Sequence, residues 1–218
     1  MSIPNTFSSI PNTIPTLWMP CPKVLWPHAE LHLWRADLGT VLVDASSLSP
    51  DEQARSEHFR RTRSLLRCLL GQYLNQVPVN LRFSYGANGK PSLAAGQSPE
   101  VLYFNLTHTD NLALVAVTAV AEAGVDAERV RPVAHAGKIA RRFFSAAEIA
   151  WLDAEPSADH FFQLWTRKEA WLKAQGAGLF LPSKHEALVS LGTIDAGKGY
   201  ASAVAVCGIM PPVKFWEW

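Results

Sequence analysis

The chain of 218 residues contains few cysteines and no long apolar run. Its three cysteines, Cys21, Cys68 and Cys207, are widely spaced, which favours neither a disulfide framework nor a zinc site and fits a reducing, cytoplasmic compartment. The longest apolar stretches, such as residues 112–121, reach about half of the roughly 20 residues that a membrane-spanning helix needs. We therefore expect no membrane association.

An excess of charge of one sign is also absent. Lys and Arg number 20 against 19 Asp and Glu, which leaves a net charge of +1. This balance argues against a nucleic-acid-binding protein, because contacts to a phosphate backbone draw on a surplus of cations. With 48% hydrophobic residues, the chain is instead expected to fold around a substantial core. Any anion site must therefore be local.

The order of secondary-structure signals predicts an α+β fold. A long helix is expected from Ser49, an N-cap followed by Pro50, to about residue 76. Strands are expected at residues 31–38, 41–43, 79–85, 101–105, 112–120, 123–128, 186–191 and 200–206, and further helices at 133–143, 146–153 and 158–175. Because strands and helices do not alternate one for one, a doubly wound parallel sheet is disfavoured. We predict two packed α+β halves, 26–115 and 116–218, after an N-terminal extension of residues 1–25.

Two carboxylates stand two residues apart on an expected strand, in Gly-Val-Asp-Ala-Glu at residues 124–128. Side chains at this spacing share a face, so Asp126 and Glu128 would repel each other unless a cation lies between them. A hard divalent cation such as Mg²⁺, which takes oxygen ligands, would relieve that repulsion. The simpler alternative is a solvated strand edge.

A helix of the second half carries a carboxylate among large apolar side chains. Glu169 falls on the same face as Phe162, Trp165 and Leu172, at spacings of three and four residues. An ion pair between Glu169 and Lys173, four residues apart, would explain this placement structurally. Alternatively, Glu169 is a third metal ligand and Lys173 contacts a phosphate or a leaving group.

Other motifs have structural as well as functional interpretations. Ser145 and Glu148 form a Ser-x-x-Glu capping box, although Glu148 is alternatively a base or a water-mediated ligand. His108 follows an apolar strand in an expected polar turn, where it is either a surface histidine or a donor to an anion at a cleft rim. Arg67 and Lys90 are likewise either solvated charges or anion contacts.

The order and spacing of these motifs resemble a known enzyme family. They are Phe-Asn-Leu-Thr-His-Thr at 104–109, Gly-Val-Asp-Ala-Glu at 124–128, Phe-Phe-Ser-x-x-Glu at 143–148, and Trp-x-x-Lys-Glu-Ala-x-x-Lys with Gly-x-Gly at 165–178. Arg-Cys-Leu-Leu-Gly at 67–71 and Asn-Gly-Lys-Pro at 88–91 belong to the same pattern. From about Ser49 to Val206 the chain resembles the 4′-phosphopantetheinyl transferases of the surfactin-synthetase-activating (Sfp-like) type.

The resemblance implies a fold and an activity. The fold would be a pseudo-twofold monomer of two similar α+β halves, each with a mainly antiparallel sheet and a long helix, with the active-site cleft between them. The activity would be transfer of 4′-phosphopantetheine from coenzyme A to a serine of an apo acyl or peptidyl carrier protein, with release of adenosine 3′,5′-bisphosphate. Such carriers serve nonribosomal peptide, polyketide and fatty acid biosynthesis.

The resemblance also implies roles for individual residues. Mg²⁺, or Mn²⁺ in its place, would be bound by Asp126, Glu128 and Glu169. Lys173 would contact the leaving group, and either Glu148 or Glu169 would act as base. Contacts to coenzyme A are implied for Arg55, Arg67, Lys90, Pro91, Thr107, His108 and Lys173. Glu52 departs from the pattern, since some relatives have lysine there, and this carboxylate weakens the expected site for the 3′-phosphate.

Two other functions could use the same residues. A Mg²⁺-dependent phosphohydrolase acting on coenzyme A would place water where the transferase places the serine. A catalytically silent module would bind coenzyme A or the carrier protein without transfer. The complete set of Asp126, Glu128, Glu169 and Lys173 favours an active enzyme over the silent module.

Overall fold

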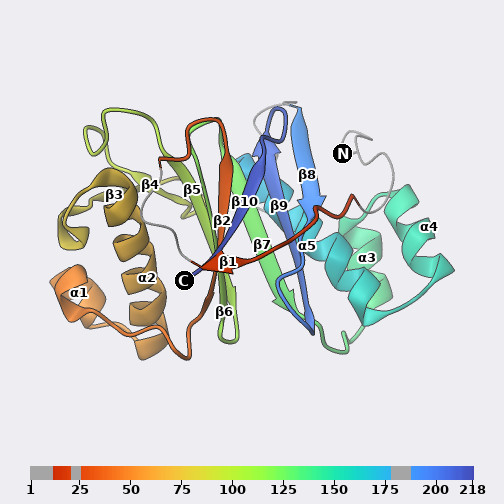
Figure 1. Ribbon diagram of the computed structural model, residues 1–218. Coiled ribbons are helices and arrows are strands. Elements are labelled where there is room, and N and C mark those ends of the chain that lie inside the picture. Colours follow the sequence, from red (N-terminus) through yellow and green to blue (C-terminus); the bar gives the residue numbers. More distant parts are fainter. Residues whose placement is uncertain (1–11, 21–25, 178–187) are drawn as a thin grey trace.

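Strands occupy the centre of the molecule and helices flank them on both sides (Figure 1). The computed structural model describes residues 12–20, 26–177 and 188–218. The helices are α1 (Pro50–Gln53), α2 (Glu57–Leu74), α3 (Ala136–Phe143), α4 (Ala146–Ala154) and α5 (Ala158–Ala174), with short 3₁₀ turns at Ala45–Ser47 and Pro78–Asn80. The strands are β1 (Met19–Pro20), β2 (Leu31–Asp37), β3 (Phe83–Tyr85), β4 (Pro91–Leu93), β5 (Tyr103–Thr109), β6 (Leu112–Thr118), β7 (Ala123–Arg129), β8 (Val189–Thr193), β9 (Tyr200–Cys207) and β10 (Val213–Glu217). The predicted α+β class is confirmed.

The strands form two sheets and a separate hairpin. The first sheet has the order β1-β10-β2-β6-β5 and the second the order β7-β9-β8, while β3 and β4 pair with each other. Pairing is antiparallel except for the two neighbours of β10. The boundary expected between residues 115 and 116 falls within β6, and β10 lies in the first sheet. By its sheet, β10 therefore belongs with the strands of the first half, although it lies in the second half of the sequence.

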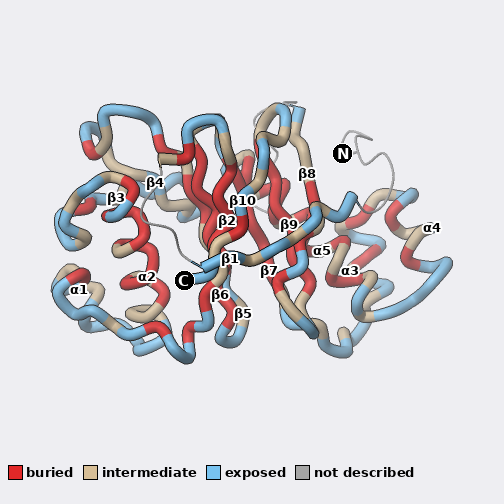
Figure 2. The backbone as a smooth tube through the Cα atoms, in the orientation of Figure 1, coloured by how far each residue is buried: buried red, intermediate tan, exposed pale blue. Residues whose placement is uncertain are grey.

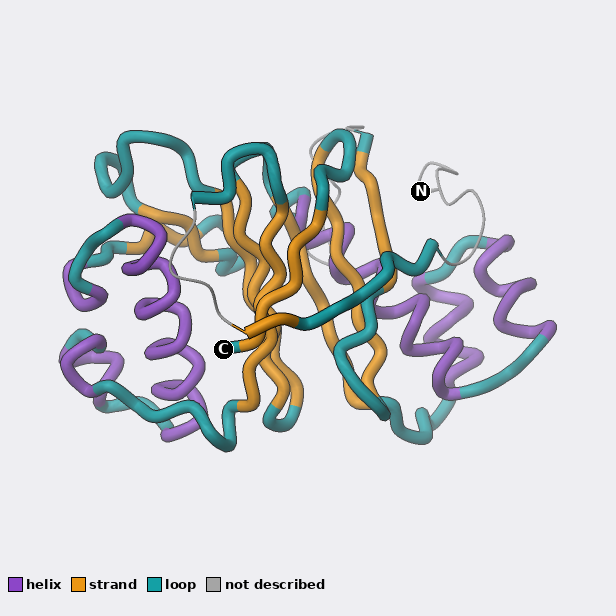
Figure 3. The backbone as a smooth tube through the Cα atoms, viewed as in Figure 1, coloured by secondary structure: helices purple, strands orange, loops and turns teal. Residues whose placement is uncertain are grey.

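The central strands of the sheets, such as β6 and β9, are buried on both faces, because further layers cover them on each side (Figure 2). On one side, α2 packs its apolar stripe, including Leu66 and Leu70, against the first sheet. The opposite face of that sheet, with Leu33 and Leu114, packs against the second sheet. Helix α5 covers the remaining face of the second sheet. Figure 3 shows the resulting arrangement of strands between helices.

The long helix expected after Ser49 is two helices. Ser49 caps α1 with Pro50 at its first turn, as predicted, but α1 ends after a single turn. The Ser56 side chain then accepts a hydrogen bond from the backbone N–H of Phe59 and starts α2. A serine cap can begin a new helix without Gly or Pro, so the break left no strong signal in the sequence.

Three strand predictions need correction. Residues 41–43 form no strand, because the chain turns where the Asp37 carbonyl accepts the N–H of Val41. Residues 78–80 form a 3₁₀ turn, so β3 begins only at Phe83 and not at Val79. Strand β5 continues to Thr109, so His108 lies on a strand rather than in a turn. Strands β1, β4 and β10 were not predicted. Residues 186–187 and Gly178 lie outside the described part of the chain.

The described part of the N-terminal extension lies along the sheets. Ile14 donates its backbone N–H to the carbonyl of Thr193, and Trp18 packs edge-on against Phe215 with ring centroids 5.3 Å apart. Among the residues described, none of the helices combines the length and apolarity that a membrane crossing requires.

Candidate functional site

Side chains join the two sheets where β5 meets β7. The Asn105 amide oxygen accepts the backbone N–H of Val125 at 2.9 Å. Thr107 donates its hydroxyl to Asp126 Oδ1 at 3.2 Å, and Thr109 accepts the backbone N–H of Arg129 at 3.3 Å. Every second residue of β5 from Asn105 to Thr109 therefore bonds to the neighbouring edge strand. This seam fixes the position of β7, which carries Asp126 and Glu128.

Gly124 permits a close contact between β7 and α5. A Cβ atom at residue 124 would lie 2.1 Å from the carbonyl oxygen of Ala170 and 2.4 Å from the backbone nitrogen of Ala174. Backbone atoms cannot move aside as the end of a flexible side chain can, so a side chain is excluded here. Helix α5 consequently approaches β7 closely enough to bring its own polar side chains to those of the strand.

Asp126 is the centre of the resulting polar group. Its Oδ1 atom accepts a 2.6 Å hydrogen bond from Lys173 Nζ on α5, in addition to the bond from Thr107. Lys173 also donates to the carbonyl oxygen of Val125 at 3.2 Å. Asp126 is only 5% exposed. Burial raises the pKa of Asp126, even though the Lys173 ammonium acts in the opposite direction.

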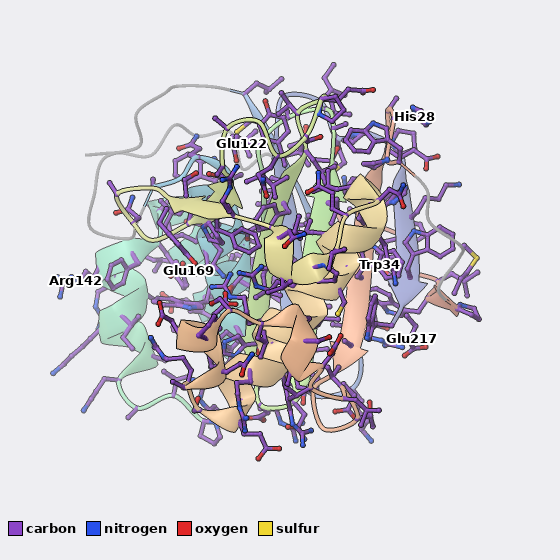
Figure 4. The ribbon with its side chains drawn as sticks, turned by 90° about the vertical axis from the view of Figure 1, so that its left-hand side faces the viewer. His28, Trp34, Glu122, Arg142, Glu169 and Glu217 are labelled. Atoms are coloured by element: carbon purple, nitrogen blue, oxygen red, sulfur yellow. The ribbon has the colours of Figure 1, made fainter. Side chains whose placement is uncertain are left out.

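Glu169 and Glu128 extend this group. Burial raises the pKa of Glu169, and the negative charges of Asp126 and Glu128 raise it further, so the three carboxylates interact electrostatically. Figure 4 shows Glu169 towards the middle of the molecule, whereas Arg142 lies at its outer edge. Glu128 is more accessible and forms an ion pair with Arg131 at 3.2 Å. The grouping of Asp126, Glu128, Glu169 and Lys173 as one site therefore stays a prediction, of which the structure shows the Lys173–Asp126 bond.

The residues fit a hard cation in one respect. Asp126 Oδ2 is buried and has no hydrogen-bond partner among the described residues. A buried carboxylate oxygen without a donor is costly, and a divalent cation with oxygen ligands would satisfy it. However, no group of three His, Cys, Asp or Glu residues within 12–20, 26–177 and 188–218 is already close enough together to hold a metal ion. The carboxylates thus form an incomplete arrangement, in which the Lys173 ammonium supplies the positive charge.

Glu148 lies apart from this group. It forms the predicted capping box, in which its carboxylate accepts the Ser145 backbone N–H at 2.6 Å and the Ser145 hydroxyl accepts the Glu148 N–H. Its second contact is the buried Lys168 ammonium at 3.6 Å, and Lys168 also donates to the carbonyl of Phe143. The structure therefore gives Glu148 a structural environment and does not bring it to Asp126.

Arg67 is held by the protein itself. Its guanidinium makes two bonds to the Glu52 carboxylate, at 2.7 and 3.2 Å, and donates to the carbonyl oxygens of Pro78 and Leu81. The residue is 5% exposed. Glu52 also lies 3.3 Å from Arg63. The expected contact between Arg67 and a substrate phosphate thus competes with an internal carboxylate.

His108 and Arg55 lie on the α2 side of the first sheet. The Nδ1 atom of His108 is 3.1 Å from Nε2 of His58, a residue that sequence reasoning did not single out. Partial burial, together with the neighbouring His58 and Lys173, lowers the pKa of His108. Arg55 is exposed and stacks over the ring of Phe59 at 4.9 Å.

The turn between β3 and β4 reaches the second half of the chain. Lys90 Nζ donates to Glu122 Oε2 at 2.6 Å, to the Lys173 carbonyl at 2.8 Å and to the Ala123 carbonyl at 3.0 Å. Pro91 follows as the first residue of β4. The cationic end of Lys90 is thus bound by protein acceptors, while the backbone around Pro91 remains at the surface of the turn.

A pocket of about 320 Å³ opens beside Glu128. Arg131 lines it together with Glu128, and its walls are the apolar side chains of Val133, Phe162 and Trp165 among others. Sequence reasoning missed this pocket, because its wall comes from α3, α5 and the segment after β7, which are separated along the chain. The only signal was the cluster of aromatic residues at 161–165.

Comparison with known proteins identifies the family. A sequence model of the 4′-phosphopantetheinyl transferase superfamily matches residues 122–208, which include β7, α5 and β9. The 4′-phosphopantetheinyl transferase HetI of Nostoc sp. is 36% identical over 232 residues, covering 92% of this chain and 98% of the relative. The chain belongs to the 4′-phosphopantetheinyl transferase family. The sequence-based prediction of a transferase of this kind is confirmed.

Two further relatives represent other members of the same family. The 4′-phosphopantetheinyl transferase AcpT of Escherichia coli K12 is 38% identical over 153 residues, which cover 66% of this chain and 74% of the relative. The 4′-phosphopantetheinyl transferase Sfp of Bacillus subtilis is 30% identical over 149 residues, which cover 63% of this chain and 64% of the relative. The similarity therefore extends across several kinds of 4′-phosphopantetheinyl transferase.

Proposed function

We propose that this 4′-phosphopantetheinyl transferase moves the phosphopantetheine group of coenzyme A to the serine hydroxyl of an apo acyl or peptidyl carrier protein, at the contact between β7 and α5. Family membership supports the reaction. The observation that supports this location is the buried Asp126 carboxylate, which bonds Lys173 through one oxygen and leaves the other without a partner among the described residues. A pyrophosphate substrate requires positive charge at such a point.

Mg²⁺, or Mn²⁺, would be held by Asp126, Glu128 and Glu169 together with the substrate pyrophosphate. When bound, the metal would neutralise charge on the phosphate oxygens. Binding it requires the three carboxylates to be ionised, and the raised pKa values of Asp126 and Glu169 indicate that their mutual repulsion and burial now oppose ionisation. A cation would remove this opposition.

Side chains would assist the transfer of the phosphopantetheine group and the accompanying proton transfer. The serine oxygen attacks the β-phosphorus, a new P–O bond forms, and the bond from that phosphorus to the bridging oxygen breaks with its electron pair on adenosine 3′,5′-bisphosphate. Lys173 offsets the charge on this leaving group or protonates it. Glu169 is the proposed acceptor of the serine proton, because its carboxylate interacts with Asp126 and Lys173, the pair at which the reaction is proposed to occur. Glu148 is the less favoured base, because its capping bond and Lys168 already engage its carboxylate.

Coenzyme A would then lie in the proposed cleft between the halves, with its nucleotide end against the first half. Arg55, His108 and the Thr107 hydroxyl are the proposed phosphate contacts, and the turn at Lys90 and Pro91 is the proposed boundary of the adenine site. Arg67 is retained as a 3′-phosphate contact only if the phosphate displaces Glu52. The pocket beside Glu128 is the proposed site of the pantetheine arm, because its wall is largely apolar.

The finer assignments are also proposals. We propose that the enzyme belongs to the Sfp-like branch and acts as a monomer of two halves with the cleft between them. Its partners would be carrier proteins of peptide, polyketide or fatty acid synthesis. The motif Trp-x-x-Lys-Glu-Ala at residues 165–170 supports this branch.

The deciding experiment is incubation with coenzyme A, Mg²⁺ and several apo carrier proteins, followed by intact-protein mass spectrometry of each carrier. We expect one carrier serine to gain a single phosphopantetheine group, and chelation of the metal to stop the gain. Hydrolysis of coenzyme A without carrier modification would instead support the phosphohydrolase. Binding of coenzyme A with neither product, across acyl and peptidyl carriers, would support the silent module.

A further inference from the structure

The β3–β4 hairpin links the long helix of the first half to the long helix of the second. At the end of β3, just before the turn, the Tyr85 hydroxyl accepts a hydrogen bond from Arg63 of α2 at 3.2 Å. At its tip, Asn88 Nδ2 donates to the Gly176 carbonyl at 2.7 Å, just beyond the end of α5. A two-stranded hairpin of three-residue strands is marginal by itself, so these contacts determine where it lies.

Lys90, at the end of the turn, makes three further contacts. Its ammonium has three N–H donors, and it reaches three acceptors: Glu122 Oε2, the Ala123 carbonyl and the Lys173 carbonyl. Only 16% of its side chain is exposed. All three acceptors belong to β7, the turn before it, or the end of α5. Lys90 therefore ties together the two elements whose side chains meet at Asp126.

The contact with α5 has a further effect. The Lys173 carbonyl is in the last turn of the helix, where carbonyl groups carry partial negative charge and favour a cation. The same residue, Lys173, extends its side chain to Asp126 at 2.6 Å. A shift of this last turn would move the Lys173 ammonium, because backbone and side chain belong to one residue.

We infer that Lys90 is a positioning residue for the Lys173–Asp126 pair, and that the β3–β4 hairpin is a clamp that holds the end of α5 against β7. This inference rests on the proposed function and deepens it. It assigns the Lys90 ammonium to protein acceptors and not to a substrate phosphate. Asn88 supports the same clamp through Gly176.

The test compares Lys90→Met and Lys90→Arg with the wild-type enzyme, after carrier modification by the wild type has been shown. We expect Lys90→Met to lower kcat by about tenfold or more while the KM for coenzyme A changes less than about twofold, because displaced groups slow the chemical step. Lys90→Arg keeps a cation that can reach Glu122 and should recover part of kcat. Lys214→Met, on β10 and 3.8 Å from Glu30, is the matched control and should behave as wild type.

A second readout does not depend on catalysis. Hydrogen exchange in the Lys90→Met variant should become faster for the amides of Gln175 and Ala177, which bond to the last carbonyls of α5, and should stay unchanged in α2. If Lys90→Met fails to fold, Asn88→Ala removes one tip contact and should show both effects more weakly. A raised KM with unchanged kcat would overturn the inference in favour of a coenzyme A contact, and unchanged kinetics with unchanged exchange would also overturn it. Absence of transfer by the wild-type enzyme would instead refute the proposed function.

Discussion

Lys173 bonds only one of the two carboxylate oxygens of Asp126. Oδ1 accepts a 2.6 Å bond from the ammonium, whereas Oδ2 is buried and has no partner among the described residues. The lysine alone does not compensate for burial, since the pKa of Asp126 is still raised. This imbalance is the physical basis for expecting a further cation at the site.

Asp126→Asn should abolish transfer without unfolding the protein. We expect a loss of at least about a hundredfold in kcat/KM, because a charge needed in the transition state is removed. The apo melting temperature should not fall, since the ionised form of Asp126 is disfavoured in the folded chain. Mg²⁺ should raise the melting temperature of the wild-type enzyme and not that of the variant. An equal rise in both would contradict a role for Asp126 in metal binding.

The two candidate bases should separate by mutation. Glu169→Gln is expected to eliminate single-turnover transfer, whereas Glu148→Gln should keep most of the rate in the folded protein. Glu148→Gln should instead lower the free energy of unfolding by about 3 kcal/mol, because it leaves the buried Lys168 without its charged partner. Quenched-flow assays measure the single-turnover rate, and urea denaturation measures the free energy of unfolding. Loss of chemistry in stable, folded Glu148→Gln would make Glu148 the base.

Gly124→Ala should damage both stability and activity. The added methyl group would collide with the backbone of α5 at Ala170, so we expect a loss of at least about 2 kcal/mol in the free energy of unfolding. Gly137→Ala is the control, because a Cβ at residue 137 would make only ordinary van der Waals contacts. Since Gly137 lies within helix α3, this variant should raise the free energy of unfolding by about 0.5–1 kcal/mol. Similar stability of the two variants in urea would show that β7 and α5 can separate at low cost.

Glu52→Gln should alter discrimination between coenzyme A and its 3′-dephospho form. The wild-type carboxylate neutralises Arg67 through two bonds, and the neutral amide would leave the guanidinium to a phosphate. We expect the ratio of the two affinities to shift towards coenzyme A by about tenfold or more in isothermal titration calorimetry. An unchanged ratio would show that Arg67 does not contact the 3′-phosphate.

His32 should make stability depend on pH. Burial lowers the pKa of His32, while its ring bonds Tyr73 and Glu30. The unfolded chain therefore binds more protons than the folded chain at pH values between the lowered pKa and the ordinary value of 6.5. The free energy of unfolding should fall as pH drops below about 7, because the unfolded state is increasingly protonated there. His32→Gln should show a shallower fall in urea titrations, and exposed His28→Gln should match the wild type.

The sequence predicted the elements whose signals are local. Alternation of apolar and polar residues predicted β2, helical spacing predicted α5, and the Ser-x-x-Glu box predicted the start of α4. The break before α2 and the strand β10 were missed. A serine cap within a helical pattern gives a weak signal, and β10 gains its partners β1 and β2 only from distant parts of the chain.

What the sequence determined by itself was the set of chemical groups: two carboxylates on one strand face, a third carboxylate and a lysine on one helix, and the family pattern that they share. The tertiary structure decided which of these groups meet. The small size of Gly124 lets α5 approach β7, so that Lys173 bonds Asp126. Glu148 instead bonds Ser145 in the helix cap and pairs with Lys168, and Arg67 bonds Glu52. Such pairings depend on contacts between residues far apart in the chain, and burial then sets the charge that each group prefers.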